Sequence, residues 1–174
     1  MKNNKLFWAL SILGILLCVI APILFATPFI ERKFGSLSNP ISGFELMQGG
    51  EYVAEGGSGF AIEVSFFVCL GVALVSLMLP VLNHLQKTGK IKPKLKPING
   101  SVRITLAIIF ALIPFIINLM TLKLTGYADN PLAHLGGGAI ASGLLVVFGA
   151  TLVTVSSVMM EKQNTNEDEQ ADKE

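Results

Sequence analysis

The stretch VSFFVCLGVALVSLMLPVL, residues 64–82, contains no charged side chain and is followed by the polar pair Asn83 and His84. A helix rises about 1.5 Å per residue, and the hydrocarbon core of a bilayer is about 30 Å thick. A helix that crosses the bilayer therefore needs roughly 20 apolar residues, which this stretch nearly supplies alone. The stretch predicts a transmembrane helix.

Three further runs of the same kind cover residues 6–26, 104–122 and 137–160. None of them alternates apolar and polar residues as a barrel strand does. A helix satisfies its own backbone hydrogen bonds in lipid, so we expect an all-α membrane protein, a four-transmembrane-helix bundle formed by residues 1–160. The composition agrees: 52% of the residues are hydrophobic, 14% are charged and the mean hydropathy is +0.64. Soluble domains usually carry about 25% charged residues.

The distribution of lysine and arginine predicts the orientation of the chain in a cell membrane. Residues 83–103 hold six basic and no acidic residues, and the N-terminus carries Lys2 and Lys5. The connection between the first two spans, residues 27–63, has a net charge of −3. We therefore expect a multi-pass protein with cytoplasmic N- and C-termini and a cytoplasmic basic loop. Residues 161–174, with a net charge of −4 and no large apolar side chain, predict a disordered acidic tail.

The outer segment, residues 27–63, is too rich in large apolar side chains for a purely disordered loop. Two glycines between Phe44-Glu45-Leu46-Met47 and Glu51-Tyr52-Val53 favour a small extracellular β-hairpin-like segment there. Two strands alone are marginal in water, so we expect them to rest on the helix ends or on a partner. Phe44, Glu45 and Tyr52 are the candidate recognition residues; alternatively, the segment only covers the bundle.

Three polar residues near the spans are candidates for a functional role: Glu63, Asn118 and His134. Glu63 precedes the second span and either suits the positive end of the helix dipole at the membrane boundary or binds a cation or proton. Asn118 lies one turn after Pro114, which should kink the third span; it needs a partner on another helix or marks a polar passage. His134 lies outside, where it is able to meet Glu63 or Glu31.

Small residues repeat along several spans and predict close helix contacts. In the fourth span Gly138 and Ser142 are four residues apart, and Gly149 and Ala150 follow. Gly14 and Cys18 have the same spacing in the first span. The second cysteine, Cys69, recurs in a similar pattern with Ser65 and Ala73, so both cysteines are expected to pack rather than react.

No nucleotide-binding, metalloprotease or hydrolase motif is present, so we predict a non-enzymatic protein without catalytic, cofactor or metal residues. The layout resembles that of claudin-type four-span proteins, but residues 27–62 lack the tryptophan and cysteine signature of that family. The resemblance is one of topology alone.

The sequence favours a protein that acts through association with lipid, a membrane protein partner or a second copy of itself. Such a protein would be an accessory subunit, an immunity or stress factor, or an envelope organiser. The basic loop has no aromatic stacking residues, so nucleic acid is not an expected partner. The alternative is a small transporter or channel with a polar route near Glu63, Asn118 and His134, and a lipid-modifying enzyme is a third hypothesis.

Overall fold

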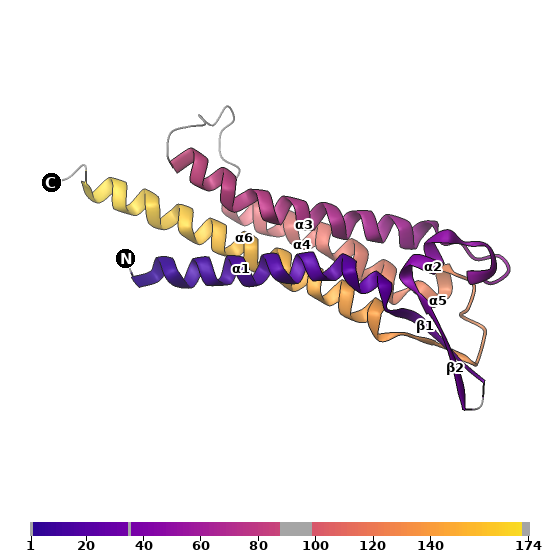
Figure 1. Cartoon of the computed structure of the whole chain (residues 1–174). Helices are drawn as coiled ribbons and strands as arrows, with labels where there is room; N and C mark the ends of the chain where they lie inside the picture. Colours follow the sequence, from indigo (N-terminus) through magenta and orange to yellow (C-terminus); the bar gives the residue numbers. More distant parts are fainter. Residues whose placement is uncertain (1, 35, 88–98, 172–174) are drawn as a thin grey trace.

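The computed structural model describes residues 2–34, 36–87 and 99–171, and four long helices form most of it. They are α1 (Lys2–Ile23), α3 (Phe60–Lys87), α4 (Gly100–Leu119) and α6 (Gly137–Ala171). Figure 1 shows the helices running side by side, with both termini at one end of the bundle and a small sheet at the other. By length and composition, each of these four helices is apolar enough to cross a membrane, and each overlaps one of the four expected helices.

Two helix ends differ from the expectation. The third span was expected to reach residue 122, but α4 ends at Leu119 and a short helix, α5 (Thr121–Leu124), follows. Helix α6 continues to Ala171, where the composition predicts disorder after residue 160. Once a helix is nucleated, adding residues costs little, and Glu, Gln and Lys are good helix formers.

A β-hairpin is present between the first two long helices, but the expected position of its strands was wrong. The strands are β1 (Pro28–Phe34) and β2 (Leu37–Ser42), whereas the expected strand segments form α2 (Gly43–Gln48) and η2 (Gly50–Tyr52). The reason is a capping box, in which the Ser42 hydroxyl accepts a hydrogen bond from the Glu45 N–H and the Glu45 carboxylate accepts one from the Ser42 N–H. This local signal starts a helix where the glycines favoured a turn.

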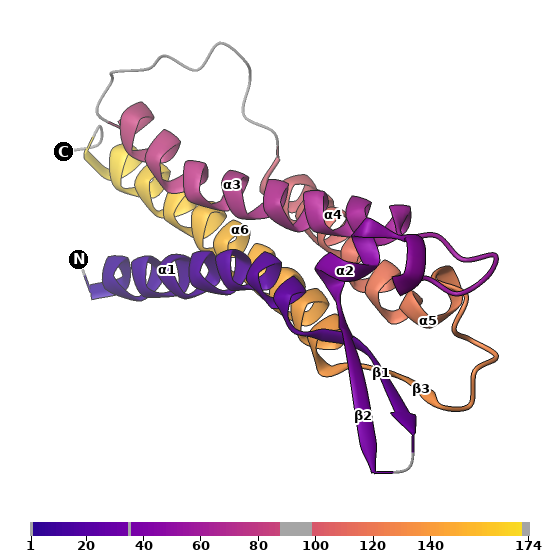
Figure 2. The ribbon, with the colours of Figure 1, turned by 45° about the vertical axis from the view of Figure 1, so that its right-hand side comes forward.

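A third strand, β3 (Ala133–Leu135), lies between α5 and α6 and pairs with β1. The sheet order is β2-β1-β3, and both pairings are antiparallel. Figure 2 shows the β1–β2 hairpin projecting from the end of the bundle, with its free end away from the helices. The connections at this end of the bundle thus build one structure, although the paired residues Ile30 and Leu135 are 105 positions apart in sequence.

The bundle is packed around α6, which contacts α1, α3 and α4. At the crossing with α1, a Cβ atom on Gly149 would lie 2.6 Å from the Cys18 sulfur. At the crossing with α4, a Cβ atom on Gly143 would lie 2.8 Å from the Phe115 ring. The small residues of the first and fourth spans therefore form helix contacts, as predicted.

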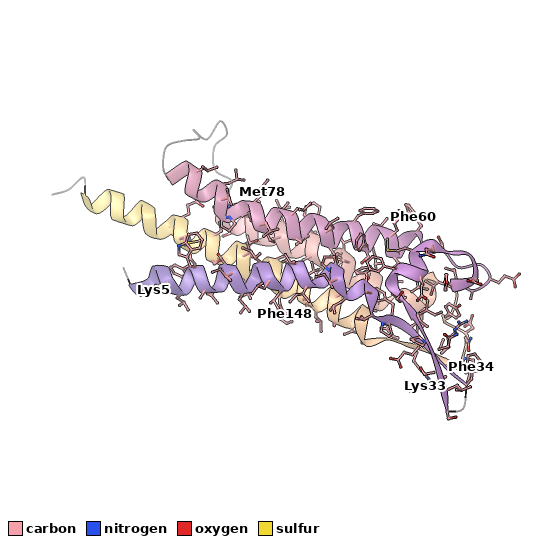
Figure 3. All side chains as sticks on the ribbon, in the orientation of Figure 1. Lys5, Lys33, Phe34, Phe60, Met78 and Phe148 are labelled. Atoms are coloured by element: carbon pink, nitrogen blue, oxygen red, sulfur yellow. The ribbon has the colours of Figure 1, made fainter. Side chains whose placement is uncertain are left out.

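The exterior of the long helices is far more apolar than the surface of a soluble protein. Large apolar side chains cover the outside of the helices, with exposed fractions of 69% for Phe60, 61% for Met78 and 58% for Phe148. Figure 3 labels these three, Phe60 and Met78 on α3 and Phe148 on α6, each directed away from the bundle. The buried polar residues include Ser11, Ser65, Ser76, Asn118, Ser142 and Ser156. A continuous apolar exterior of this size is typical of a surface that faces lipid or a partner.

Candidate functional site

A buried polar junction joins three of the long helices. Asn118 of α4 is fully buried; its side-chain oxygen accepts a hydrogen bond of 2.7 Å from the Ser65 hydroxyl of α3. Its amide nitrogen donates to the Ser142 hydroxyl of α6 at 2.8 Å. Ser142 donates in turn to the carbonyl of Ala139 at 3.2 Å. Asn118 therefore has the interhelical partners that a buried amide requires.

Two buried threonine hydroxyls after Asn118 also form hydrogen bonds within the chain. The Thr121 hydroxyl donates to the Asn118 carbonyl at 2.7 Å, and the Thr125 hydroxyl donates to the Thr121 carbonyl at 2.6 Å. Both threonines are fully buried. These bonds satisfy the two buried hydroxyl groups where α4 passes into α5.

Glu63 lies in the first turn of α3 and is half-buried. It precedes Ser65 by two residues, which places the two side chains roughly 200° apart around the helix. Glu63 therefore does not face the junction at Asn118. The hydroxyl of Ser58 accepts a hydrogen bond of 3.2 Å from the N–H of Phe60, the first residue of this helix.

His134 lies on β3, exposed, and its Cα partner on β1 is Glu31. His134 is therefore a cross-strand neighbour of Glu31, which was one of the two glutamates expected near it. Among residues 2–34, 36–87 and 99–171, no group of three or more His, Cys, Asp or Glu residues is close enough to hold a metal ion. The three candidates Glu63, Asn118 and His134 lie on separate parts of the molecule.

The residues of the candidate recognition segment have structural partners. The Glu45 carboxylate accepts hydrogen bonds from the Ser42 N–H at 2.7 Å and from the Ser42 hydroxyl at 2.8 Å. These bonds favour the charged form and lower the pKa of Glu45 from its ordinary value. Tyr52 lies beside the Glu51 carboxylate, whose charge raises the pKa of the Tyr52 phenol.

We call residues 27–59 together with residues 121–136 the outer cap. Its two segments are joined by main-chain and side-chain bonds. The Ala54 N–H donates to the Thr125 carbonyl at 3.0 Å, and the Ser58 N–H donates to the Leu124 carbonyl at 2.9 Å. The Tyr127 hydroxyl donates to the Tyr52 carbonyl at 3.3 Å. The outer cap is therefore an ordered structure that rests on the helix ends, as the apolar content of the segment predicted.

Aromatic rings fix the cap to the helices below it. The Phe44 ring of α2 lies 5.4 Å from the Phe66 ring of α3, which in turn lies 5.3 Å from the buried Phe25 ring. Below Phe44, an apolar groove of about 380 Å³ runs between α1 and α3. Its lining consists of Val19, Pro22, Ile23, Phe44, Phe66, Leu70, Ala73, Leu74 and Leu77. The groove offers contact with hydrocarbon and no polar chemistry.

Arg32 was not among the residues singled out from the sequence. It lies in β1, the central strand, with its guanidinium 5.8 Å from the centre of the Tyr127 ring. The Nε atom of Arg32 is buried, and no acceptor for it exists within the described part of the chain. The sequence around Arg32 does not distinguish it from other basic residues. Its contact with Tyr127 arises only when the chain folds.

Comparison with known proteins gives no match, whether with a family model, a curated protein or a solved structure. The interpretation of the outer cap and of the junction at Asn118 therefore depends on their geometry alone.

Proposed function

We propose that the chain is a multi-pass protein of the cell membrane that crosses the bilayer four times and acts by association rather than by catalysis. The proposal places both termini and the basic loop in the cytoplasm and the outer cap outside. Its support is the largely apolar exterior of the helices together with the uneven distribution of basic residues between the two ends.

The contact surface is the outer cap. The observation that supports this assignment is the order of the cap: two distant segments are tied together by the bonds of Ala54, Ser58 and Tyr127. Ordered irregular structure held by a rigid scaffold is typical of recognition sites. Within the cap, the end of the hairpin exposes Leu37 to 73% and Phe34 to 50%, so large apolar side chains are available to a partner.

The alternative, a transporter or channel, has less support. Asn118 is bonded to Ser65 and Ser142, and these groups are closely packed. Glu63 points away from this junction and His134 lies on the sheet. A polar route needs polar groups that remain open to water or to an ion. The described residues do not line such a route.

The orientation is tested with single cysteines and a membrane-impermeant maleimide on intact cells. Cys18 and Cys69 are replaced by alanine in every variant, because both are buried and unpaired. Lys33→Cys should be labelled in intact cells, and Lys162→Cys only after permeabilisation. The reverse pattern would refute the orientation, and labelling of both positions would refute the predicted four-span topology.

Association is tested by photocrosslinking from Asn39, on the exposed hairpin, and from Val75, on the apolar outside of α3. A crosslinker at Asn39 should give a discrete protein adduct that can be identified, while the crosslinker at Val75 should react mainly with lipid. Purified protein in vesicles should carry no more cation or proton flux than empty vesicles. Flux that is abolished by Glu63→Gln would favour the transporter instead.

A further inference from the structure

The guanidinium of Arg32 is the unused chemical group of the outer cap. Arginine presents planar N–H donors that match the two oxygens of a carboxylate. The Nε atom of Arg32 is buried without a hydrogen-bond acceptor, as is the Nε atom of Arg103, and among residues 2–34, 36–87 and 99–171 Arg32 forms no ion pair with an acidic side chain. A buried Nε atom is out of reach of an external ligand, so an external carboxylate would bind the terminal N–H groups of the guanidinium.

The sheet register shows what surrounds this group. Asn39 is the Cα partner of Arg32, and Leu37 is the Cα partner of Phe34. Directly opposed residues of antiparallel strands share a face, and so do residues two apart in one strand. Arg32, Asn39, Phe34 and Leu37 therefore lie on one face of the hairpin, which we call the arginine face. Lys33 belongs to the opposite face by the same alternation.

The arginine face combines two kinds of contact. Near the bundle it presents the guanidinium, which the Tyr127 ring supports at 5.8 Å, and the exposed amide of Asn39. Towards the free end it presents the exposed side chains of Phe34 and Leu37. Figure 3 labels Phe34 on the part of the hairpin that is remote from the four long helices. A bound peptide could therefore place a carboxylate at the guanidinium and a neighbouring apolar side chain against Phe34 and Leu37.

We propose that the arginine face binds an extended segment of a partner protein that presents an aspartate or glutamate next to a large apolar residue. The charge of the unpaired Arg32 supplies the complementarity, and Phe34 and Leu37 supply the apolar contact. This proposal rests on the proposed function, because it assigns the partner chemistry of the outer cap. A lipid phosphate would satisfy the guanidinium as well, but the hairpin extends away from the helices whose apolar surfaces match lipid (Figure 2).

The chain contains two arginines, Arg32 and Arg103, so the spectrum of arginine Nε–H groups has two signals. Arg103 forms an ion pair with Glu161 in the bundle and serves as the internal control. The full chain, labelled with ¹⁵N-arginine, is placed in phosphatidylcholine nanodiscs. It is then titrated with acetyl-Leu-Glu-Phe-amide or with the neutral counterpart acetyl-Leu-Gln-Phe-amide.

The glutamate peptide should shift the Arg32 signal saturably and leave the Arg103 signal in place. Affinity should fall at least about tenfold, or about 1.4 kcal/mol, for the glutamine peptide and for the Arg32→Gln variant. Lys33→Gln, which removes the neighbouring cation on the other face, should change affinity less than about twofold. Arg32→Lys, which keeps the charge without the planar fork, should bind several-fold more weakly than the unaltered chain.

An Arg32 signal that does not move with the glutamate peptide, or that moves equally with both peptides, would overturn the proposal. A shift caused only by phosphatidylglycerol in the disc would assign the group to a lipid phosphate and would overturn it too. The peptide comparison uses the unaltered chain, so the test does not depend on the folding of a variant. If the crosslinks from Asn39 persist in Arg32→Gln, association stands and only carboxylate recognition fails.

Discussion

A Cβ atom on Gly149 would lie 2.7 Å from the carbonyl oxygen of Gly14, so α1 and α6 meet backbone to backbone at this crossing. Lipid tails are as apolar as the side chains of the helices, so burial from water contributes little to helix association in a bilayer. Packing and interhelical hydrogen bonds carry the association instead. Several predictions of stability depend on these contacts.

Gly149→Ala should destabilise the bundle by about 1–3 kcal/mol, because the added methyl group has no space beside Gly14 and Cys18. The matched control is Gly71→Ala in α3, where a Cβ atom would meet nothing within 4 Å. The control should be neutral or more stable by up to about 1 kcal/mol, since alanine favours helix over glycine. Unfolding of both variants is followed in detergent. Equal losses at the two positions would contradict the crossing.

Asn118→Ala should cost about 1–3 kcal/mol, because it removes hydrogen bonds to Ser65 and Ser142 that contribute about 0.6–1.7 kcal/mol each in membrane proteins. A double-mutant cycle of Asn118→Ala with Ser142→Ala should show a coupling energy of at least about 0.5 kcal/mol. Thr105→Ala is the control: Thr105 is exposed and bonds only within α4. Additive losses in the cycle would show that the junction does not join α4 to α6.

The capping box should loosen in acid. The Ser42 donors hold the pKa of Glu45 below its ordinary value of 4.5, so the folded chain retains the charged carboxylate more strongly than the unfolded chain does. This stabilisation is complete above the unfolded pKa and is lost as the pH falls through the lower, folded value. The Ser42 amide proton should therefore shift as the pH falls from about 6 to about 3.

Glu45→Gln should abolish the shift of the Ser42 amide proton, because the glutamine side chain does not titrate. Glu55→Gln, an exposed change elsewhere in the outer cap, should leave the shift intact. A titration that survives in Glu45→Gln would assign the effect to another group.

Gly136→Ala should detach β3 from β1. A Cβ atom there would lie 2.3 Å from the Pro28 carbonyl oxygen, whereas on the neighbouring Gly137 it would meet nothing within 4 Å. The readout is the disulfide between Glu31→Cys and His134→Cys, whose Cα atoms face each other across the strands. It should form readily in the parent and in Gly137→Ala, and poorly in Gly136→Ala. Equal yields in all three would contradict the sheet.

The sequence by itself determined the four helices. Length and hydropathy are local properties, and residues 64–82 carry both without help from the rest of the chain. The small residues Gly14 and Gly149 also predict close contacts between helices. They do not specify which helices meet. The capping box of Ser42 and Glu45 is equally local, and the two glycines after it end α2 and begin η2 rather than form a hairpin turn.

Only the tertiary structure decided how the outer connections combine. The strand β3 joins β1 from about a hundred residues further along the chain, as the pairing of Ile30 with Leu135 shows. No local pattern specifies such a pairing, because a three-residue strand carries too little periodicity to set its own partner. The partners of Asn118 and the position of Arg32 over Tyr127 have the same origin. Each depends on residues that folding brings together from separate segments, and their identity is absent from the neighbouring sequence.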